Sequence, residues 1–220
     1  MRGPRREVAM IDQSTLEGVV RFHGHMCRGL AMGIRAAEVA LAEIGPHSAD
    51  EEVVAIVETD MCGVDAVQFL TGCTFGKGNL VHRDHGKNAY TFVRRSDGRA
   101  VRVSTRPGAW GAREPEWEAL FARVRAGMAT PEERQRFWAQ QQERSEHLLS
   151  VPVEDLYAVE EVAVEVPPRA RVDPSVGCAT CQEPTTETRI RRLGGRDLCL
   201  PCFEAVLAGT EPVAPPAGRS

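Results

Sequence analysis

Two Cys-x-x-Cys pairs close to the C-terminal end constrain the fold more than any other feature of this sequence. Cys178 and Cys181 form the first pair, Cys199 and Cys202 form the second, and residues 182–198 separate them. This spacing is typical of a four-cysteine zinc site. Four thiolates fill the tetrahedral shell of Zn²⁺ and leave no position for a substrate, so the predicted site is structural. A segment of about 35 residues has too small a core to fold alone, and bound metal would supply the missing stability.

Disulfides or redox-active pairs are the alternative interpretation of these cysteines. The chain has seven cysteines, an odd number, and no apolar run follows its basic first residues to form a signal peptide. We therefore expect a cytoplasmic protein, in which cysteines bind metal or react as thiols more often than they form disulfides. No stretch approaches the ~20 consecutive apolar residues of a membrane span, so no membrane contact is expected.

The residues around the two pairs predict a small zinc finger similar to a treble clef. Residues 186–190 and Gly194-Gly195 predict a hairpin, and residues 203–208 predict a short helix after the last cysteine. Nucleic acid is not an expected partner, because the net charge is −4 and acidic residues dilute the basic ones of this segment. The basic residues are Arg189, Arg191, Arg192 and Arg196, and the acidic ones are Glu183, Glu187, Asp197 and Glu204.

A second group of metal-binding residue types lies near the start of the chain. Residues 22–29 place His23, His25 and Cys27 at every second position beside two glycines. Cys62 and Cys73 follow in two further segments, 60–65 and 71–79, that also contain glycines. Imidazole and thiolate together suit zinc, iron or copper, and three protein ligands with one open position could activate water or bind a substrate.

Two other interpretations of these residues stay open. Cys27 could be a nucleophilic or redox-active thiol, with His23 or His25 as its base, because the start of a helix favours a thiolate. Alternatively, Cys62 and Cys73 could be small buried apolar residues, with the histidines serving only the fold. The glycine-rich loop 71–79 with Lys77 could hold an anion. His82, His85 and Lys87 could border the pocket, and His47 and His147 are expected at the surface.

The hydrophobic pattern predicts alternating helices and strands of the α+β class. Apolar residues at spacings of three and four predict a helix over 30–44 that ends at Gly45-Pro46. Thr130, Pro131 and Glu133 match a helix start with a capping box. Further helices are expected at 16–22, 64–70, 115–126 and 131–149, and strands at 52–58, 89–93, 99–103 and 159–166, with a turn at 96–98.

Composition also predicts where the chain divides. Pro167-Pro168 and the polar residues after them indicate a boundary between two domains. The expected organisation is a flexible arm at 1–12, a core domain at 13–166, a linker at 167–174, a zinc finger at 175–208 and a disordered tail at 209–220.

Three blocks of the sequence resemble the signature of the FmdE family, named after a component of formylmethanofuran dehydrogenase. They are Phe22-His23-Gly24-His25-x-Cys27-x-Gly29-Leu30, Asp60-x-Cys62-x-x-Asp65-Ala66 and Thr71-Gly72-Cys73-Thr74-x-Gly76-Lys77-Gly78-Asn79-Leu80. The resemblance implies an α+β core followed by a zinc finger, and an intertwined homodimer with a cysteine cavity as its active or metal site. The residues it carries over are His23, His25, Cys27, Cys62, Asp65 and Cys73. The family block has proline where this chain has Arg28.

These observations together lead us to expect a metal-binding protein with a His/Cys site in its N-terminal domain. His25, Cys27 and Cys62 are the primary candidates, Asp65 supports them, and Lys77 contacts an anion or substrate. The expected metals are Zn²⁺ in the finger and a second transition metal, Zn or Fe, in the N-terminal site.

The expected context is a formylmethanofuran-dehydrogenase-like molybdenum or tungsten system, in which this chain is an accessory or a component. The expected partners are a second copy, oxidoreductase subunits or a small-molecule ligand. The alternatives are a regulatory protein whose finger binds a partner or nucleic acid, and a thiol redox enzyme centred on Cys27. Whether the protein is an enzyme is left open.

Overall fold

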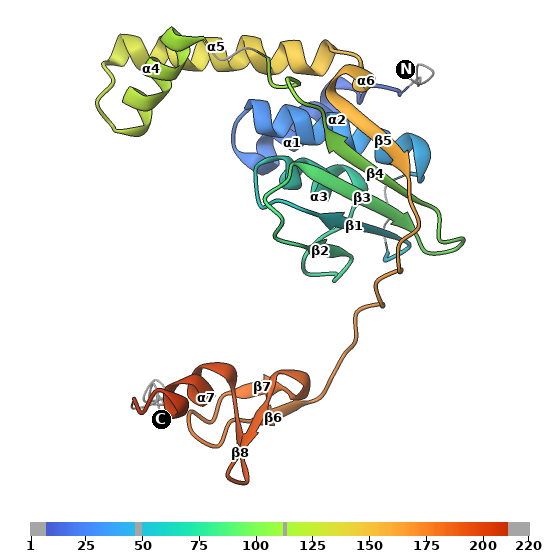
Figure 1. Ribbon diagram of the computed structural model, residues 1–220, viewed down its shortest axis with the longest axis vertical. Coiled ribbons are helices and arrows are strands. Elements are labelled where there is room, and N and C mark those ends of the chain that lie inside the picture. The colour runs from blue at the N-terminus through green and yellow to red at the C-terminus, as the bar shows by residue number, and fades with distance from the viewer. Residues whose placement is uncertain (1–7, 47–49, 112–113, 211–220) are drawn as a thin grey trace. The chain divides into compact units, whose positions relative to one another are not determined.

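The computed structural model describes residues 8–46, 50–111 and 114–210, and the chain divides into two compact units between Ala170 and Arg171 (Figure 1). His47, the first seven residues of the expected arm and the expected tail from residue 211 lie outside the described residues. Among the described residues, no helix is both long enough and apolar enough to cross a bilayer.

The first unit is built on a five-stranded sheet, which confirms the α+β class. The strand order is β2-β1-β3-β4-β5, with β2 parallel to β1 and the other neighbours antiparallel. The hairpin between β3 and β4 was predicted, whereas β2 was not, because it has only three residues and follows a loop. The strands are β1 (Val53–Val57), β2 (Leu80–His82), β3 (Ala89–Arg94), β4 (Ala100–Thr105) and β5 (Tyr157–Glu161).

The predicted last strand is shorter than expected. It was placed at 159–166, but β5 ends at Glu161. Val162, Val164 and Val166 continue without strand pairing and pack instead against apolar residues on one face of the sheet. Their alternation therefore reports burial on one side, which an extended segment shows whether or not it pairs with a neighbour.

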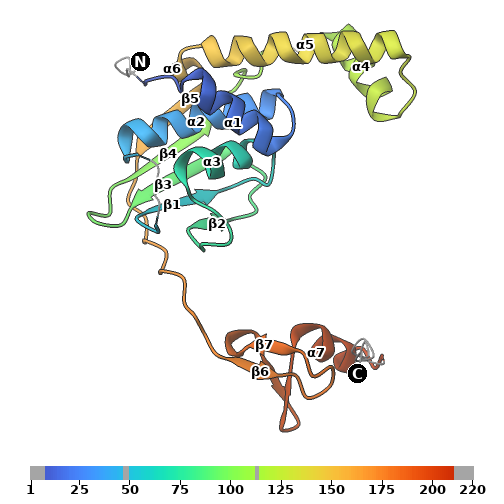
Figure 2. The same ribbon diagram turned by 180° about the vertical axis from the view of Figure 1, so that it is seen from behind.

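Six helices accompany the sheet, and the longest predicted ones are confirmed. Helix α2 is buried along its length from Leu30 to Ala40 and packs on the opposite face of the sheet from Val162 (Figures 1 and 2). The short helix α6 was not predicted. The helices are α1 (Gln13–His23), α2 (Arg28–Glu43), α3 (Gly63–Thr71), α4 (Pro115–Arg125), α5 (Pro131–Ser150) and α6 (Val153–Leu156).

Helices α2 and α3 approach each other at a glycine contact. A Cβ atom added to Gly33 would lie 2.3 Å from the carbonyl oxygen of Gly63, closer than any real side chain can come. The two backbones can therefore touch only because Gly33 has no side chain. This close crossing brings the N-terminal ends of both helices, and the cysteines that precede them, into one region.

Helices α4 and α5 form an arm that extends beyond the sheet (Figures 1 and 2). The predicted capping box begins α5: Thr130 Oγ1 accepts a hydrogen bond from Glu133 N, and the Glu133 carboxylate accepts one from Thr130 N. The two helices pack through a narrow aromatic stripe that includes Trp117 and Phe137, whose rings stack 5.0 Å apart.

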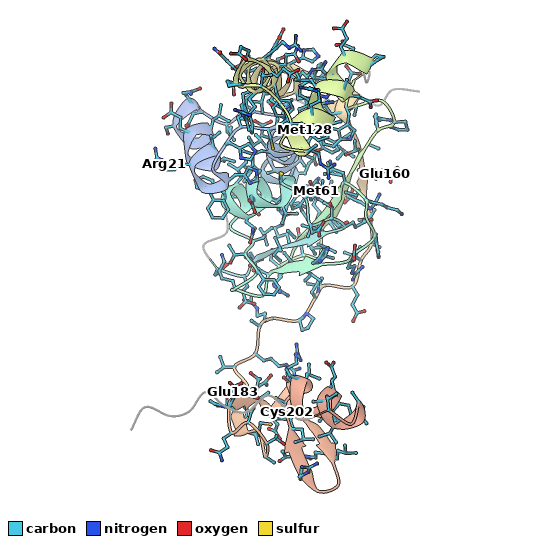
Figure 3. All side chains as sticks on the ribbon, turned by 90° about the vertical axis from the view of Figure 1, so that its left-hand side faces the viewer. Arg21, Met61, Met128, Glu160, Glu183 and Cys202 are labelled. Atoms are coloured by element: carbon cyan, nitrogen blue, oxygen red, sulfur yellow. The ribbon has the colours of Figure 1, made fainter. Side chains whose placement is uncertain are left out.

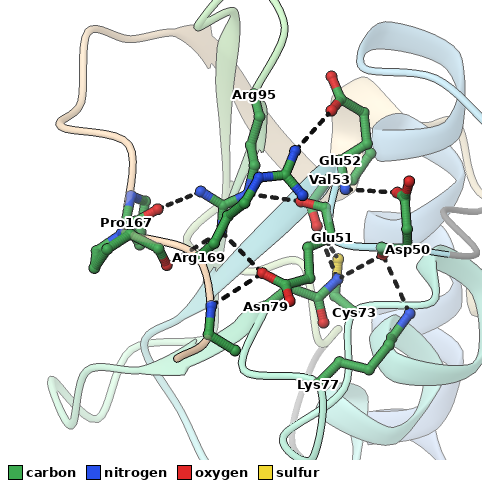
Figure 4. Close-up of polar contacts among 12 residues, drawn as sticks. Asp50, Glu51, Glu52, Val53, Cys73, Lys77, Asn79, Arg95, Pro167 and Arg169 are labelled. Atoms are coloured by element: carbon green, nitrogen blue, oxygen red, sulfur yellow. Dashed lines mark hydrogen bonds and ion pairs between the residues drawn. The ribbon is translucent and has the colours of Figure 1, made fainter. Parts of the chain in front are cut away.

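The segment that leaves the sheet is held against the first unit. Arg95 donates hydrogen bonds to the carbonyl oxygens of Pro167 and Pro168, and Ala170 N donates to the Glu51 carboxylate at 3.1 Å (Figure 4). Residues 167–170, part of the expected linker, are therefore bound to the core unit. At the other end, Ile11 N donates to Glu38 Oε1 at 3.0 Å, so the expected arm is attached to the core by its last residues.

The second unit consists of two antiparallel strand pairs and one helix. Gly194 and Gly195, with φ of 58° and 75°, form the turn between β8 and β9, as the sequence predicted. Helix α7 begins at Leu200 rather than at residue 203, so Cys202 lies in its first turn. The elements are β6 (Ser175–Gly177), β7 (Pro184–Thr186), a 3-10 turn η1 (Glu187–Arg189), β8 (Arg191–Leu193), β9 (Arg196–Leu198) and α7 (Leu200–Leu207).

Candidate functional site: a cysteine and histidine cluster beside an aromatic cavity

A tight turn between α1 and α2 carries the first three candidate residues. His23 is the last residue of α1, and Gly24 ends that helix with φ of 97°, which a residue with a side chain rarely adopts. Cys27 is the N-cap of α2, and its sulfur accepts a hydrogen bond from Leu30 N at 3.3 Å. The structure thus places Cys27 directly before the helix, where the sequence predicted it.

The metal-binding atoms of His23, His25 and Cys27 lie within 4.8 Å of one another. His23 Nε2 is 3.9 Å from Cys27 Sγ, and His23 Nδ1 is 2.6 Å from a carboxylate oxygen of Asp65. The carboxylate holds one ring nitrogen of His23, so the other nitrogen faces the sulfur. Asp65, predicted as a supporting residue, therefore contacts the cluster through His23.

Cys62 joins this cluster from the start of α3. A Cβ atom added to Gly29 would lie 3.7 Å from Cys62 Sγ and 3.9 Å from Cys27 Sγ, so both sulfurs lie beside the same glycine. Burial raises the pKa of the Cys62 thiol to about 11, and the neighbouring Cys27 adds to the shift. Without a metal, Cys62 is consequently a thiol rather than a thiolate at neutral pH.

A cavity of about 530 Å³ opens beside the two sulfurs. Its lining includes Cys27, Cys62 and His25 on one side and aromatic residues of the α4–α5 arm on the other. The ring of His25 meets the edge of Trp138 at 5.8 Å between centroids. The volume lies within the range of about 300–1,000 Å³ that is usual for small-molecule sites.

Two predicted site residues are not brought to the cluster. Cys73 is fully buried in the core between helices and sheet, and its sulfur donates to the carbonyl oxygen of Val53 at 3.3 Å. Lys77 donates to the carbonyl oxygen of Asp50 in the same region (Figure 4). Because α3 has nine residues and rises ~1.5 Å per residue, Cys62 and Cys73 lie at its two ends, roughly 14 Å apart along the axis.

Sequence reasoning missed several residues that line the cavity. Trp138, Phe121, Asn88 and Gln141 come from two helices and a loop that carry no recognisable motif. One signal was present: Trp138 is a large aromatic residue on an otherwise polar helix. The predicted border residue His85 instead pairs with Glu58 at 3.2 Å, while Asn88, from the same loop, lines the cavity.

The second unit contains the four clustered cysteines. All four are buried, and their sulfur atoms lie within 4.8 Å of one another. Cys178 accepts a hydrogen bond from Cys199 N at 3.3 Å. Burial opposes ionisation of Cys178, but hydrogen bonds from neighbouring N–H groups outweigh it and lower its pKa to about 6. The cluster, which includes Cys202 (Figure 3), can bind a metal ion that prefers thiolates.

Comparison with known proteins adds three findings. The model of a family described as "FmdE, Molybdenum formylmethanofuran dehydrogenase operon" matches residues 22–158. A protein of Archaeoglobus fulgidus named "Probable S-adenosyl-L-methionine-binding protein" is 36% identical over 193 residues, which cover 82% of this chain and 50% of that protein. The chain therefore spans about half the length of this relative.

The third finding concerns the fold. The crystal structure of an FmdE-like protein of the tungsten formylmethanofuran dehydrogenase type, from Syntrophus aciditrophicus, matches with a TM-score of 0.60 at 24% identity. The match covers 91% of this chain and 97% of that one. At this identity the likeness supports the fold, and it leaves the chemistry to the residues themselves.

Proposed function

This chain belongs to the FmdE family, and we propose that its Cys/His cluster binds a second transition metal, Zn²⁺ or Fe²⁺, beside a cavity for a small ligand. The observation that supports this proposal is the convergence of His23, His25 and Cys27 within 4.8 Å, with Cys62 adjacent. In the second unit, the proposed metal of the four-cysteine cluster is Zn²⁺ in a structural role.

The donor atoms fit such a metal. Two imidazoles and one or two thiolates form a borderline-soft set, which suits zinc and ferrous iron. His23 gives its Nδ1 to Asp65 and keeps Nε2 for the metal, as in the carboxylate–histidine pairs that support many metal sites. Gly29 leaves the space beside the two sulfurs that a side chain would fill.

The site separates metal binding from ligand binding. A metal bound here would act as a Lewis acid toward a ligand in the cavity. Asp65 orients His23, and the buried position of Cys27 at the start of α2 keeps its sulfur facing the other donors. The aromatic arm limits the access of water to the cluster, because Trp138 lies against His25.

A thiol redox enzyme is the second candidate, and one observation favours it. Cys27, His23 and Asp65 form the sulfur–imidazole–carboxylate sequence that activates nucleophilic cysteines. This function requires reactive Cys27 in the metal-free protein. The regulatory alternative, with a finger that binds nucleic acid, is weaker because the second unit pairs Arg192 with Glu187 and Asp197.

The family description supplies the proposed context. It names an operon of molybdenum formylmethanofuran dehydrogenase, so we infer that the chain serves as an accessory or component of a related cytoplasmic oxidoreductase. Its proposed partners are a second copy of itself and subunits of that enzyme. Copurification of such subunits with the tagged chain tests this part, and sedimentation of the purified chain as a monomer contradicts the homodimer.

Elemental analysis of purified variants tests the metal proposal directly. The wild-type protein should contain two metal equivalents, Cys27→Ala and Cys62→Ala one, and Cys199→Ser the other one. Cys73→Ala is the matched control, because its sulfur lies in the core away from the cluster, and it should keep both. Unchanged metal content in Cys27→Ala contradicts the metal site, and rapid alkylation of Cys27 in that case supports the redox enzyme.

A further inference from the structure

The cavity beside the cluster has walls of two different kinds, and both indicate what it binds. Two of the three tryptophans of the chain, Trp110 and Trp138, line it together with Phe121. Trp138 is 50% exposed and Phe121 is 40% exposed, so large ring surfaces face solvent beside the cavity. Exposed apolar surface at a concave site is typical of a binding surface. Met61 and Met128, both strongly exposed, lie on the same side of the first unit (Figure 3).

The polar part of the lining contains unsatisfied amides. The side-chain oxygens of Asn88 and Gln141 are buried and have no hydrogen-bond partner among the described residues. A buried polar atom without a partner costs free energy, so native structures usually supply one. An amide group offers a donor and an acceptor side by side, and Asn and Gln use this pair to recognise the edge of a purine ring.

The charges of the lining exclude another class of aromatic-bound ligand. Aromatic walls also bind organic cations, which usually find a carboxylate nearby. Here no carboxylate lines the cavity within the described part of the chain, and the lining includes the cation Arg28, which lies over the ring of Trp110. A second positive charge would be repelled, so the cavity favours a neutral or anionic ligand.

We propose that this cavity binds a planar nitrogen heterocycle of the adenine type, stacked on the aromatic residues and read along its edge by the amides of Asn88 and Gln141. This inference deepens the proposed function and rests on it for the role of the cavity. A ring stacked on Trp138 would lie next to His25, since those two side chains are in contact. A substituent on the ring would then reach the metal cluster.

The test uses adenosine as the probe, with the purified full chain and isothermal titration calorimetry. Adenosine should bind saturably, and Gln141→Ala should weaken binding about threefold to tenfold, the effect of one hydrogen bond. Gln140→Ala is the matched control, because its amide oxygen is also buried without a partner among the described residues but lines a different cavity. That variant should bind adenosine as the wild type does.

Two further ligands separate the proposed recognition from its competitors. N6,N6-dimethyladenosine keeps the ring but lacks the N–H donors, so it should bind more weakly and should not be weakened further by Gln141→Ala. Tetramethylammonium should not bind. In NMR spectra, adenosine should shift the indole signals of Trp110 and Trp138, while Trp117, which does not line the cavity, serves as the internal reference.

Several results would overturn the inference. They are the absence of adenosine binding at millimolar concentration, equal losses in Gln140→Ala and Gln141→Ala, and tighter binding of tetramethylammonium. If Trp138→Ala dissociates a dimer and no nucleoside binds, the aromatic surface belongs to a contact between copies. Metal content is measured in every sample. Lost adenosine binding with full metal refutes this inference alone, whereas adenosine binding without metal at Cys27 refutes only the metal site.

Discussion

The glycine contact between α2 and α3 gives the sharpest test of how the fold builds the site. In Gly33→Ala, the new Cβ would lie 2.3 Å from the carbonyl oxygen of Gly63 and 2.4 Å from its Cα, whereas ordinary contact begins near 3.4 Å. The obstruction is backbone on both sides, so no rotamer change can relieve it. The helices must separate by roughly 1 Å, and the core above them must adjust.

The expected size of the effect follows from two opposing terms. Alanine is favoured over glycine inside a helix by about 1 kcal/mol. Overpacking costs about 1–3 kcal/mol, and a clash with rigid backbone belongs at the upper end. Gly33→Ala should therefore lower the free energy of unfolding by about 2 kcal/mol, as the difference of these terms. Because Cys27 and Cys62 precede the two helices, the same separation should weaken metal binding at the cluster.

Urea titration and elemental analysis measure the two effects, and Gly18→Ala is the matched control. At Gly18 the nearest atom is the end of the Phe69 ring at 2.7 Å, and Phe69 is 37% exposed, so the ring can move aside. This variant should stay within about 0.5 kcal/mol of the wild type and keep its metal. A Gly33→Ala protein that is as stable as wild type and fully loaded with metal would refute the reasoning.

Three further predictions concern charge and metal. Asp65→Asn should lower the metal affinity of the cluster about 10- to 100-fold, because His23 loses the carboxylate that orients it; chelator competition measures this, and unchanged affinity contradicts it. Removal of metal by a chelator should expose the four-cysteine unit to proteolysis while a fragment close to the predicted 13–166 core persists; simultaneous loss of both would contradict separate domains. Burial alone would raise the pKa of Glu58, but hydrogen bonds from Arg102 and His85 outweigh it and lower that pKa. Its stabilising contribution is therefore complete above its ordinary value of 4.5 and is lost as the pH falls through the lowered pKa. Glu58→Gln should flatten the pH dependence of the unfolding free energy below pH 4.5, and an unchanged slope would disprove this assignment.

Local sequence signals predicted the elements well wherever neighbouring residues decide the structure. The capping box at Thr130, the spacing of apolar residues in α2 and the glycine turn of the second unit all depend on contacts within a few residues. The strand β2 was missed because three residues carry too little pattern. The end of β5 was misplaced because alternation reports burial and not pairing.

The candidate site shows the same division. The motif blocks identified Cys27 and Cys62, and the structure brings both beside Gly29. They could not show that Cys73 turns into the core, although its place beyond the far end of α3 gave a geometric warning. The cavity wall was out of reach, since the α4–α5 arm meets the cluster only after the chain has folded back over it.

The sequence by itself determined the family, the α+β class, the four-cysteine cluster and the residue types available for a second metal site, because these follow from spacing and local pattern. Tertiary structure alone decided which cysteines converge, that Asp65 holds His23, and that unpaired amides and aromatic rings face one cavity. The physical reason is that such contacts join residues far apart in the chain. Their distances are set by how closely helices cross, here at Gly33, and no local pattern records that distance.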